Sequence, residues 1–474
     1  MISDPQLLKA ISLTIFLAAY AAFVIWPTRR AQVSAAAAGL AIITGVVSLS
    51  NAFWSSPEGY GGSYVNWNVM GVFFGTLVIA EFFMFSRMPE VLAEKLLSRM
   101  SSARGALVVL CLFGGVLSMF LENVAAFLIL APIGLTVARR MGKALTPVMV
   151  GLVLQSNLHG AGTMIGDPPD MLLAGYTRMG FPDFFWFFGR PSLFFAVMVG
   201  SLTGSLVLWL SYRSYKGKIE IKSRTKPTSW FPLIMIGMLI VGLGLSKLID
   251  PGFVWAAGTI TMCLALIGTV WYMALTKGRI LNTEEHEALI EAEYEGRTPP
   301  RQPLLNGTAK LWQLVRHLDW DTTVFLMGIF IVVGGFTHYW VDDIAGVMAG
   351  ISSGSVLVAF VLIVLSSVTC SAFIDNVPFL LTMLPVTDAL GVSLGLDPWS
   401  VQMFFLYFGL LIGVSVGGNI TPIGATANVV AIGYLRRRGE PVRFLDYMKR
   451  GLPFTLAATF VASIFLVVFW YLLV

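Results

Sequence analysis

The chain has 474 residues, of which 57% are hydrophobic and only 12% are charged, and its mean hydropathy is +0.80. An ordinary soluble domain has roughly 45–50% apolar and about 25% charged residues, so the composition excludes a soluble globular protein. The net charge of +5 is typical of Lys and Arg at cytoplasmic helix ends in such an apolar chain, and we do not expect nucleic-acid binding.

Long apolar stretches recur from one end of the chain to the other. A helix needs roughly 20 apolar residues to cross a bilayer core of about 30 Å. The first stretch lacks a small-residue cleavage site, so it is interpreted as a retained span and not as a signal peptide. The sequence predicts an all-α polytopic protein of the inner membrane, in contact with lipid, with spans that include 7–26, 31–50, 67–86, 191–211, 252–275, 321–340 and 452–473.

Basic residues indicate which ends of the spans face the cytoplasm. They cluster at Arg29 and Arg30, at 87–104, 139–143, 213–226 and 277–316, and at Arg436 to Arg438, whereas 51–66, 341–346 and 391–398 contain no Lys or Arg. With the basic clusters in the cytoplasm, these three stretches and both termini are predicted to be external. The segment 277–318 is expected to be a cytoplasmic linker between spans.

The region 105–139 does not fit two ordinary crossings. Its apolar runs 105–120 and 124–138 are short, the polar pair Glu122-Asn123 separates them, and both of its ends carry basic residues. Irregular backbone at membrane depth is tolerated only where protein or a cavity covers it. We therefore expect a re-entrant helical hairpin that enters and leaves on the cytoplasmic side.

The same features recur in the second half of the chain. Phe120 to Val124 (FLENV) matches Phe373 to Val377 (FIDNV), and 160–170 (GAGTMIGDPPD) matches 418–428 (GNITPIGATAN). Inverted repeats with discontinuous helices are a sequence signature of secondary transporters. The predicted repeats are 1–226, with a hairpin at 105–139 and a broken helix at 145–177, and 227–474, with an external-side hairpin at 352–390 and a broken helix at 399–435.

Two carboxylates occupy matched positions at the predicted hairpin tips. An ionisable residue in an apolar hairpin needs a partner, a proton or a bound cation, so Glu122 and Asp375 are candidates for handling ions or protons. Each could instead cap a hairpin helix. Their neighbours Asn123 and Asn376 offer amide donors and acceptors to a cation or a polar substrate, or else satisfy broken backbone.

The two predicted breaks contain glycines, prolines and polar side chains inside otherwise apolar spans. Proline removes a backbone donor and restricts the residue before it, so we expect extended backbone that lines a binding site, although purely structural kinks are the alternative. His159 could shuttle protons or serve only in packing. The candidate binding residues in the breaks are Asn157, Gly162, Thr163 and Asp167 in the first half, and Asn419, Thr421, Thr426 and Asn428 in the second.

The charge of the substrate stays open at this point. The core motifs contain no Lys or Arg, so an anion would have to be held by helix N-termini, whereas cations could use the carboxylates. The three cysteines, Cys111, Cys263 and Cys370, are not paired in spacing, so neither a disulfide nor a metal site is expected. No Walker-type phosphate-binding motif is present, and we expect no cofactor, no enzymatic activity and no ATP-driven pump within this chain.

Four motifs carry a resemblance to a known family: FLENVAAFLILAPI (120–133), SNLHGAGTMIGDPPD (156–170), SAFIDNVPF (371–379) and GGNITPIGATANVV (417–430). They resemble the ion transporter superfamily, particularly its arsenite permease and P-protein branch, which is related to divalent anion/sodium symporters and to sodium/proton antiporters. The resemblance implies a homodimer with a scaffold region and an elevator-like transport region. It also implies ion and substrate sites lined by Asn123, Asn376, Gly162, Thr163, Asn419 and Thr421.

The sequence departs from the patterns of these branches at three places. The Ser-Asn-Thr hairpin tips of the dicarboxylate branch are absent, which disfavours a dicarboxylate substrate. Glu122 stands where the P-protein-like pattern usually has Asp, and Asp170 stands where it usually has Asn. Asp170 therefore adds a protonatable group near the site.

The function predicted from the sequence is secondary active transport of a small inorganic ion or oxyanion, with arsenite-type efflux as the leading candidate. Coupling to H⁺ or Na⁺ would run through Glu122, Asp375 and Asp167, with His159 as a further proton-handling candidate. The alternative is a Na⁺/H⁺ antiporter that moves no other solute; a carboxylate:Na⁺ symporter and a channel are less favoured. By resemblance to some arsenite permeases, a soluble ATPase partner is left open.

Overall fold

The computed structural model describes residues 4–54, 63–217, 225–276, 280, 285, 288–290 and 307–473. Within these ranges most residues are helical, and eight helices are long and apolar enough to cross a membrane. The chain is therefore a multi-pass membrane-type protein, as its composition predicts.

The first half of the chain begins with long spans and then forms shorter helices around two interruptions. Short polar side chains fix several helix starts by accepting a backbone N–H: Asn66 accepts from Val69 and Ser102 from Gly105, which satisfies a donor that the first turn leaves free. The α-helices of this half are α1 Pro5–Ile25, α2 Arg30–Ile43, α3 Leu49–Phe53, α4 Trp67–Phe85, α5 Met88–Leu97, α6 Ala103–Ser118, α7 Asn123–Arg140, α8 Thr146–Gly160, α9 Pro168–Thr177 and α10 Leu193–Ser211.

The second half also has helices on both sides of two interruptions, and its helix starts have similar caps. Ser355 accepts from the N–H of Val358, and Ser400 accepts from that of Met403. The helices are α11 Phe231–Ile249, α12 Ala256–Leu275, α14 Gly307–His317, α15 Trp320–Ser352, α16 Val356–Ser371, α17 Asn376–Ser393, α18 Val401–Gly417, α19 Thr426–Arg437 and α20 Phe444–Leu466, which continues as a π-helical turn, Val467–Leu472. Short 3-10 turns lie at Pro27–Arg29, Phe181–Phe184 and Tyr212–Ser214.

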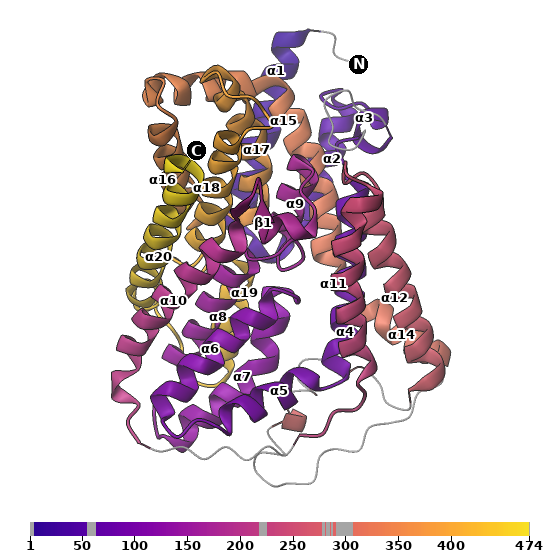
Figure 1. Cartoon of the computed structure of the whole chain (residues 1–474). Coiled ribbons are helices and arrows are strands. Elements are labelled where there is room, and N and C mark those ends of the chain that lie inside the picture. The colour runs from indigo at the N-terminus through magenta and orange to yellow at the C-terminus, as the bar shows by residue number, and fades with distance from the viewer. Residues whose placement is uncertain are drawn as a thin grey trace.

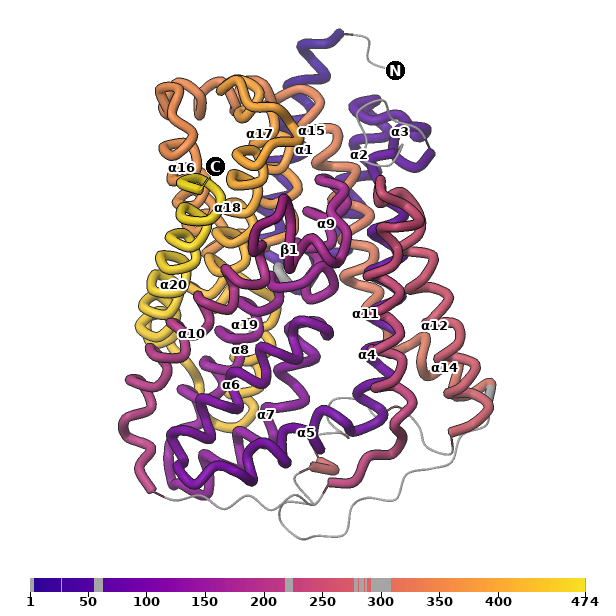
Figure 2. Tube along the Cα trace, in the orientation of Figure 1, coloured from indigo at the N-terminus to yellow at the C-terminus, as the bar shows by residue number. Residues whose placement is uncertain are grey.

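The helices form two groups that lie side by side (Figure 1). One group contains α1, α2 and α15 together with the packed set α4, α11 and α12. The other contains α6, α7, α8, α10, α16, α18, α19 and α20, and α17 packs against both α18 and α15. The pair α6 and α7 lies at the lower end of the molecule and the pair α16 and α17 at the upper end, where the first and last described residues of the chain also lie (Figure 2).

Two of the expected spans have different lengths in the structure. The span expected at 31–50 is a helix only from Arg30 to Ile43. Gly45 follows in the left-handed conformation, with a φ of 84°, and a glycine in this conformation commonly ends a helix. The span expected at 321–340 continues to Ser352, so the stretch 341–346, expected to be external loop, is helical. This helix ends where Ser353 and Gly354 have φ of 50° and 79°.

Other features differ from the sequence analysis in detail. A small antiparallel hairpin, β1 Trp186–Phe187 with β2 Arg190–Pro191, interrupts the otherwise all-α fold. Helix α7 reaches 18 residues and is therefore longer than the short arm expected. In the segment 277–318 the described residues include α14, whereas 277–279, 281–284, 286–287 and 291–306 lie outside the described residues.

The expected hairpins and breaks correspond to interruptions in the helices. Residues 119–122 separate α6 from α7, and 372–375 separate α16 from α17. Residues 161–167 separate α8 from α9, and 418–425 separate α18 from α19. The opposite membrane orientation of the two halves stays a prediction, because these boundaries give helix order and not position in a bilayer.

Candidate transport site

The two interhelical turns are built by the same pair of side chains at matched positions. In the first, the hydroxyl of Ser118 donates to Oδ1 of Asn123; in the second, the hydroxyl of Ser371 donates to Oδ1 of Asn376 at 2.6 Å. Each bond joins the last helical residue before the turn to the first one after it. Both asparagines are thus fixed in orientation, and the side chain of Asn123 also forms a hydrogen bond with Asp167.

Each helix break is fastened to the neighbouring turn through a threonine. The hydroxyl of Thr163 donates to the carbonyl of Met119 at 2.5 Å, and the hydroxyl of Thr421 donates to the carbonyl of Ala372. These bonds satisfy carbonyls that the interrupted helices leave free. In each half, turn and break therefore form one unit.

Three asparagines join α8 to the second-half break and to α19. Nδ2 of Asn157 donates to Oδ1 of Asn419 at 2.8 Å and to Oδ1 of Asn428 at 2.9 Å. Asn419 donates in turn to the carbonyl of Leu154 at 3.0 Å. All three asparagines are almost fully buried, so this cluster holds α8, the second break and α19 in one arrangement.

A cavity of about 410 Å³ lies between the two helix groups, and a smaller cavity of about 40 Å³ adjoins it through shared lining residues. The larger one is lined by the end of α1, the start of α2 and the start of α15 on one side. The smaller one is lined by the first residues of four helices, namely Asn123 of α7, Pro168 of α9, Asn376 of α17 and Thr426 of α19. Because helix N-termini carry partial positive charge, this convergence favours an anion. The start of α9 offers no N–H at its first two residues, since Pro168 and Pro169 have none.

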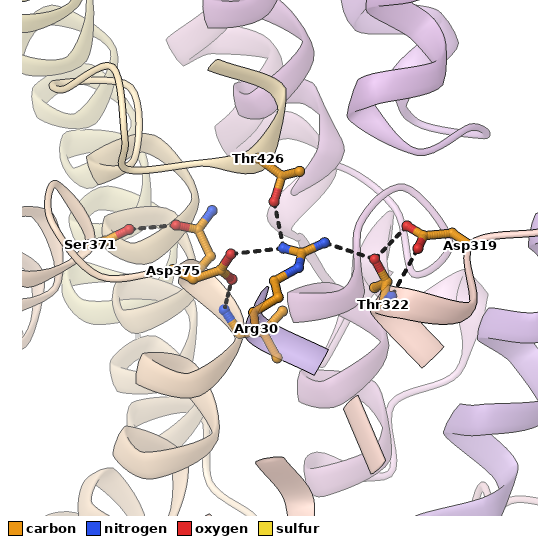
Figure 3. A network of polar contacts seen from close by, with 8 residues as sticks. Arg30, Asp319, Thr322, Ser371, Asp375 and Thr426 are labelled. Atoms are coloured by element: carbon orange, nitrogen blue, oxygen red, sulfur yellow. Dashed lines mark hydrogen bonds and ion pairs between the residues drawn. The ribbon is translucent and has the colours of Figure 1, made fainter. Parts of the chain in front are cut away.

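Arg30 stands at the centre of a polar network between the helix groups (Figure 3). Its Nη1 atom lies 3.2 Å from Oδ2 of Asp375 and 2.6 Å from Oγ1 of Thr426, and its Nη2 atom lies 2.8 Å from Oγ1 of Thr322. The guanidinium also lies over the ring of Phe325, 5.1 Å from the centroid. The side chains of Arg30 and Asp375 are 17% and 26% exposed, so both remain accessible from the cavity.

The network continues on α15. Oδ1 of Asp319 accepts the backbone N–H of Thr322 at 2.8 Å, and Oδ2 accepts its hydroxyl. Five carboxylates line the two cavities around the single guanidinium of Arg30: Glu122, Asp167, Asp319, Asp321 and Asp375. A site with this excess of acidic groups needs compensating cations whenever it also holds an anion.

The sequence-predicted site residues divide into two sets. Those that line the cavities are Glu122, Asn123, Asn157, Asp167, Asp375, Asn376 and Thr426. Those that instead support the breaks behind the cavities are Gly162, Thr163, Asn419, Thr421 and Asn428. The structure thus brings both predicted hairpin tips and both predicted breaks to one place, and the transport role of each residue stays a prediction.

His159 lies behind the site and not in it. Its Nδ1 atom is 2.9 Å from the carbonyl of Gln155 and its Nε2 atom is 3.0 Å from the hydroxyl of Ser201. It is buried and lines neither cavity. This geometry matches the packing role considered for it.

Arg30, Asp319 and Thr322 are not among the site residues predicted from the sequence. Arg30 is predicted there only as part of a cytoplasmic basic cluster, with no cation near the core motifs, which the structure corrects: a short 3-10 turn, Pro27–Arg29, returns the chain so that α2 begins at the site. The signal in the sequence was the adjacent pair Arg29-Arg30, of which only Arg30 lies in the network. Nothing local distinguishes the two residues.

A third cavity, of about 330 Å³, lies farther along α15. Phe325 lines the first cavity, whereas Phe330, Thr337 and His338 of the same helix line the third. Asp388 of α17 lines it too and accepts a hydrogen bond from Tyr407 at 2.8 Å. The helix α15 therefore passes two separate cavities at different positions along its length.

A protein-family model described as a citrate transporter matches residues 20–409 of the chain. An uncharacterized transporter of Mycobacterium tuberculosis is 25% identical over 97% of this chain and 98% of its own length. The P protein of Sus scrofa is 23% identical over 85% of this chain and 53% of its own. These similarities agree with the resemblance to the ion transporter superfamily and its P-protein-like branch.

Two solved structures share the fold. The YdaH transporter of Alcanivorax borkumensis has a TM-score of 0.53 at 15% identity, covering 90% of this chain and 87% of that one. The MtrF protein of Neisseria gonorrhoeae, described among antimetabolite efflux pumps, has a TM-score of 0.52 at 13% identity, covering 91% and 84%. At these identities the likeness concerns the fold alone.

Proposed function

The chain belongs to the citrate transporter family and is a membrane transporter, and we propose that it is a secondary active transporter that carries a small anion together with H⁺ or Na⁺. The observation that carries this proposal is the convergence of four helix N-termini and Arg30 on cavities that five carboxylates also line. An anion and a cation can thus be bound at adjacent places. That arrangement suits coupled movement of the two.

The anion would be held by the guanidinium of Arg30 and by backbone N–H groups at the helix starts. Arginine presents several donors in a planar fork that suits carboxylates and oxyanions. Arsenite and related oxyanions are the candidates from the resemblance, and the family's description adds citrate. Citrate carries about three negative charges near neutral pH, so beside five carboxylates it would have to enter with compensating cations.

Alternating access would follow from movement between the two helix groups, with the interhelical turns and breaks as the moving part. Arg30 and Thr322 belong to the group of α2 and α15, whereas Asp375 and Thr426 belong to the segments that precede α17 and begin α19. Sliding of one group past the other would break the bonds of Arg30 to Asp375 and Thr426. We also propose that the protein is a homodimer in the inner membrane, as the resemblance implies.

A second candidate function is Na⁺/H⁺ exchange without another solute. It is favoured by Glu122, Asp167 and Asp375 around the small cavity, because neighbouring carboxylates can hold a proton or a sodium ion in turn. The two candidates differ in whether cation flux requires an added anion.

The test is internal pH in proteoliposomes that contain the purified protein. A sodium pulse is given alone, with arsenite, with citrate, and with citrate plus Mg²⁺. A pH change that requires one of the anions, together with accumulation of that radiolabelled anion, is the expected result. A sodium-driven pH change that is the same with and without every anion would instead establish the antiporter and overturn anion transport.

A further inference from the structure

Asp170, in the first turn of α9, is a buried carboxylate that is not part of the transport site described above. It is 0% exposed, and among the described residues neither of its carboxylate oxygens has a hydrogen-bond partner. It lines none of the three cavities. A bare carboxylate without a partner is among the most unfavourable groups to bury, so this position needs an explanation.

The position matched to Asp170 in the second half is Asn428. Its Nδ2 atom donates to the carbonyl of Gly418 at 2.8 Å and to that of Thr421 at 2.9 Å. Both residues lie in the break that follows α18, Gly418 directly after its last residue. In this half, therefore, two protons on the side-chain nitrogen satisfy two carbonyl oxygens of the break.

The backbone of the two breaks follows the same path. The N–H of Asp170 lies 3.1 Å from the carbonyl of Asp167, and the N–H of Asn428 lies 3.1 Å from that of Ala425. The residues before the two helices have φ and ψ of −147° and 151° in Asp167 and −145° and 151° in Ala425. The carbonyls of Gly160 and Thr163 are, by position, the counterparts of the two carbonyls that Asn428 bonds.

The surroundings of Asp170 provide no cation. Helix α9 packs against α4, α17 and α18, and none of these four helices, all within the described part of the chain, contains Lys, Arg or His. Asp167 is the charged side chain that acts on Asp170 electrostatically, and it is acidic as well. The remaining ionisable side chains on these helices or at their starts are Glu81, Tyr176, Asp375, Asp388 and Tyr407.

The neighbouring helix end offers no substitute for a cation. His159 has both ring nitrogens engaged by Gln155 and Ser201. Ser415 of α18 stands at the position matched to Asn157, whose amide bonds Asn428, but its buried hydroxyl has no partner among the described residues. Asn157 bonds Asn428, but the shorter side chain of Ser415 makes no equivalent hydrogen bond to Asp170.

We infer that Asp170 is a proton-binding site in the break between α8 and α9, at which a protonated carboxyl donates to the carbonyl oxygen of Gly160 or Thr163. An ionised carboxylate would place negative oxygen against carbonyl oxygens, whereas one added proton turns one of these contacts into a hydrogen bond. A proton needs no cavity, which agrees with the absence of Asp170 from the cavity linings. Loss of this proton would loosen the break between α8, which carries Asn157, and α9, which Asp167 precedes at the transport site.

A role of this proton in coupled transport rests on the proposed function. Proton binding by Asp170 does not, since it can be measured without a substrate. Infrared spectra of the purified protein distinguish the C=O stretch of a protonated carboxylic acid from the bands of a carboxylate. The wild type should show an acid band near neutral pH that Asp170→Asn removes and Asp170→Glu shifts. Asp388→Asn, which changes a carboxyl bonded to Tyr407, is the control and should leave this band in place.

Thermal unfolding in detergent gives a second measurement. The Asp170→Asn variant copies the arrangement at Asn428, so it should fold, and its unfolding temperature should fall less than that of the wild type as the pH is raised. An acid band unchanged by both Asp170 variants would overturn the inference. So would stability that depends on Na⁺ and loses this dependence in Asp170→Asn, since that result would show a bound sodium ion in place of the proton. Neither measurement depends on whether an anion is transported.

Discussion

Arg30 contacts side chains from three parts of the chain that are hundreds of residues away from it: Thr322, Asp375 and Thr426. A partly exposed guanidinium with three oxygen neighbours has donors that a substrate anion could share or take over. At the scale of single residues, Arg30 is therefore the side chain on which anion recognition depends most.

Replacing Arg30 by Ala should weaken anion transport strongly. A hydrogen bond to a charged group contributes about 1.5–3 kcal/mol, and about 1.4 kcal/mol corresponds to a tenfold change in affinity. We therefore expect the apparent affinity for the transported anion to fall about 10- to 100-fold, measured as the concentration dependence of uptake into proteoliposomes.

The matched control is Arg29→Ala, which removes the exposed neighbour that has no part in the network. It should leave uptake close to that of the wild type. An equal loss of anion affinity in both variants would mean that the overall positive charge of this turn supports transport and that the hydrogen bonds of Arg30 do not.

At the scale of elements, each break depends on glycines at which one backbone segment of the break touches another. A Cβ added at Gly166 would lie 2.4 Å from the carbonyl oxygen of Gly160, and one added at Gly424 would lie 2.6 Å from that of Gly418. Such separations are far below van der Waals contact, and the atoms met are backbone that cannot rotate away. The glycines thus let helix ends and breaks pack closely.

The Gly166→Ala variant should consequently be less stable by about 1–3 kcal/mol, the usual effect of overpacking. The measurement is the midpoint of thermal unfolding in detergent, followed by intrinsic fluorescence. Gly433→Ala in α19 is the control, because a Cβ there meets no atom within 4 Å. A Gly166→Ala protein as stable as this control would contradict the close contact at the break.

The start of α8 depends on a residue from the other half of the chain. The carboxylate of Glu440 accepts from the backbone N–H of Leu145 at 2.9 Å and from that of Thr146 at 3.0 Å, and it also accepts the hydroxyl of Thr146. A carboxylate at a helix start binds free N–H groups and interacts favourably with the helix dipole. The loop after α19 thereby fixes the start of α8, which is the end of this helix predicted to face the cytoplasm.

Replacing Glu440 by Ala should lower the free energy of unfolding by about 1 kcal/mol, as for other lost helix caps. Thermal unfolding in detergent again measures it. Asp446→Asn, which removes one partner of an exposed ion pair with Lys449, should have a much smaller effect. If the two variants behave alike, the cap contributes no more than a surface charge.

At the scale of the whole molecule, the described termini lie at one end, and the pair α6 and α7 and helix α5 lie at the other (Figure 1). Basic clusters adjoin this second end, including Arg139 and Arg140 at the end of α7. By the positive-inside rule this end is predicted to face the cytoplasm. The first cavity is lined by residues from the start of α2 and the start of α15, so it lies nearer to that end than the third cavity, which is lined by later residues of α15.

Reporter fusions test this orientation. Alkaline phosphatase fused after the last residue should be active in cells, because the C-terminus is predicted to be external, whereas a fusion after Arg438 should be inactive. The reverse pattern would invert the membrane orientation and, with it, the side to which each cavity opens.

The sequence by itself determined the class of the protein, the helix order and much of the site. Spans that must exclude water have to be apolar over their whole length, so composition reveals them directly. Polar residues and glycines inside such spans are costly, and their recurrence at Glu122-Asn123 and Asp375-Asn376 is sufficient to identify the two turns. The same physical reason makes the breaks after α8 and α18 recognisable from their glycines, prolines and asparagines.

Only the tertiary structure decided which charged side chains join those motifs. Arg30 and Asp319 lie at the ends of spans, where a charge normally faces water and carries no information about function. Their place in the site follows from how α2 and α15 pack beside the turn before α17 and the start of α19. Packing between distant segments has no local signature, and for the same reason only the contacts within the two breaks distinguish the unpaired carboxylate of Asp170 from the bonded amide of Asn428.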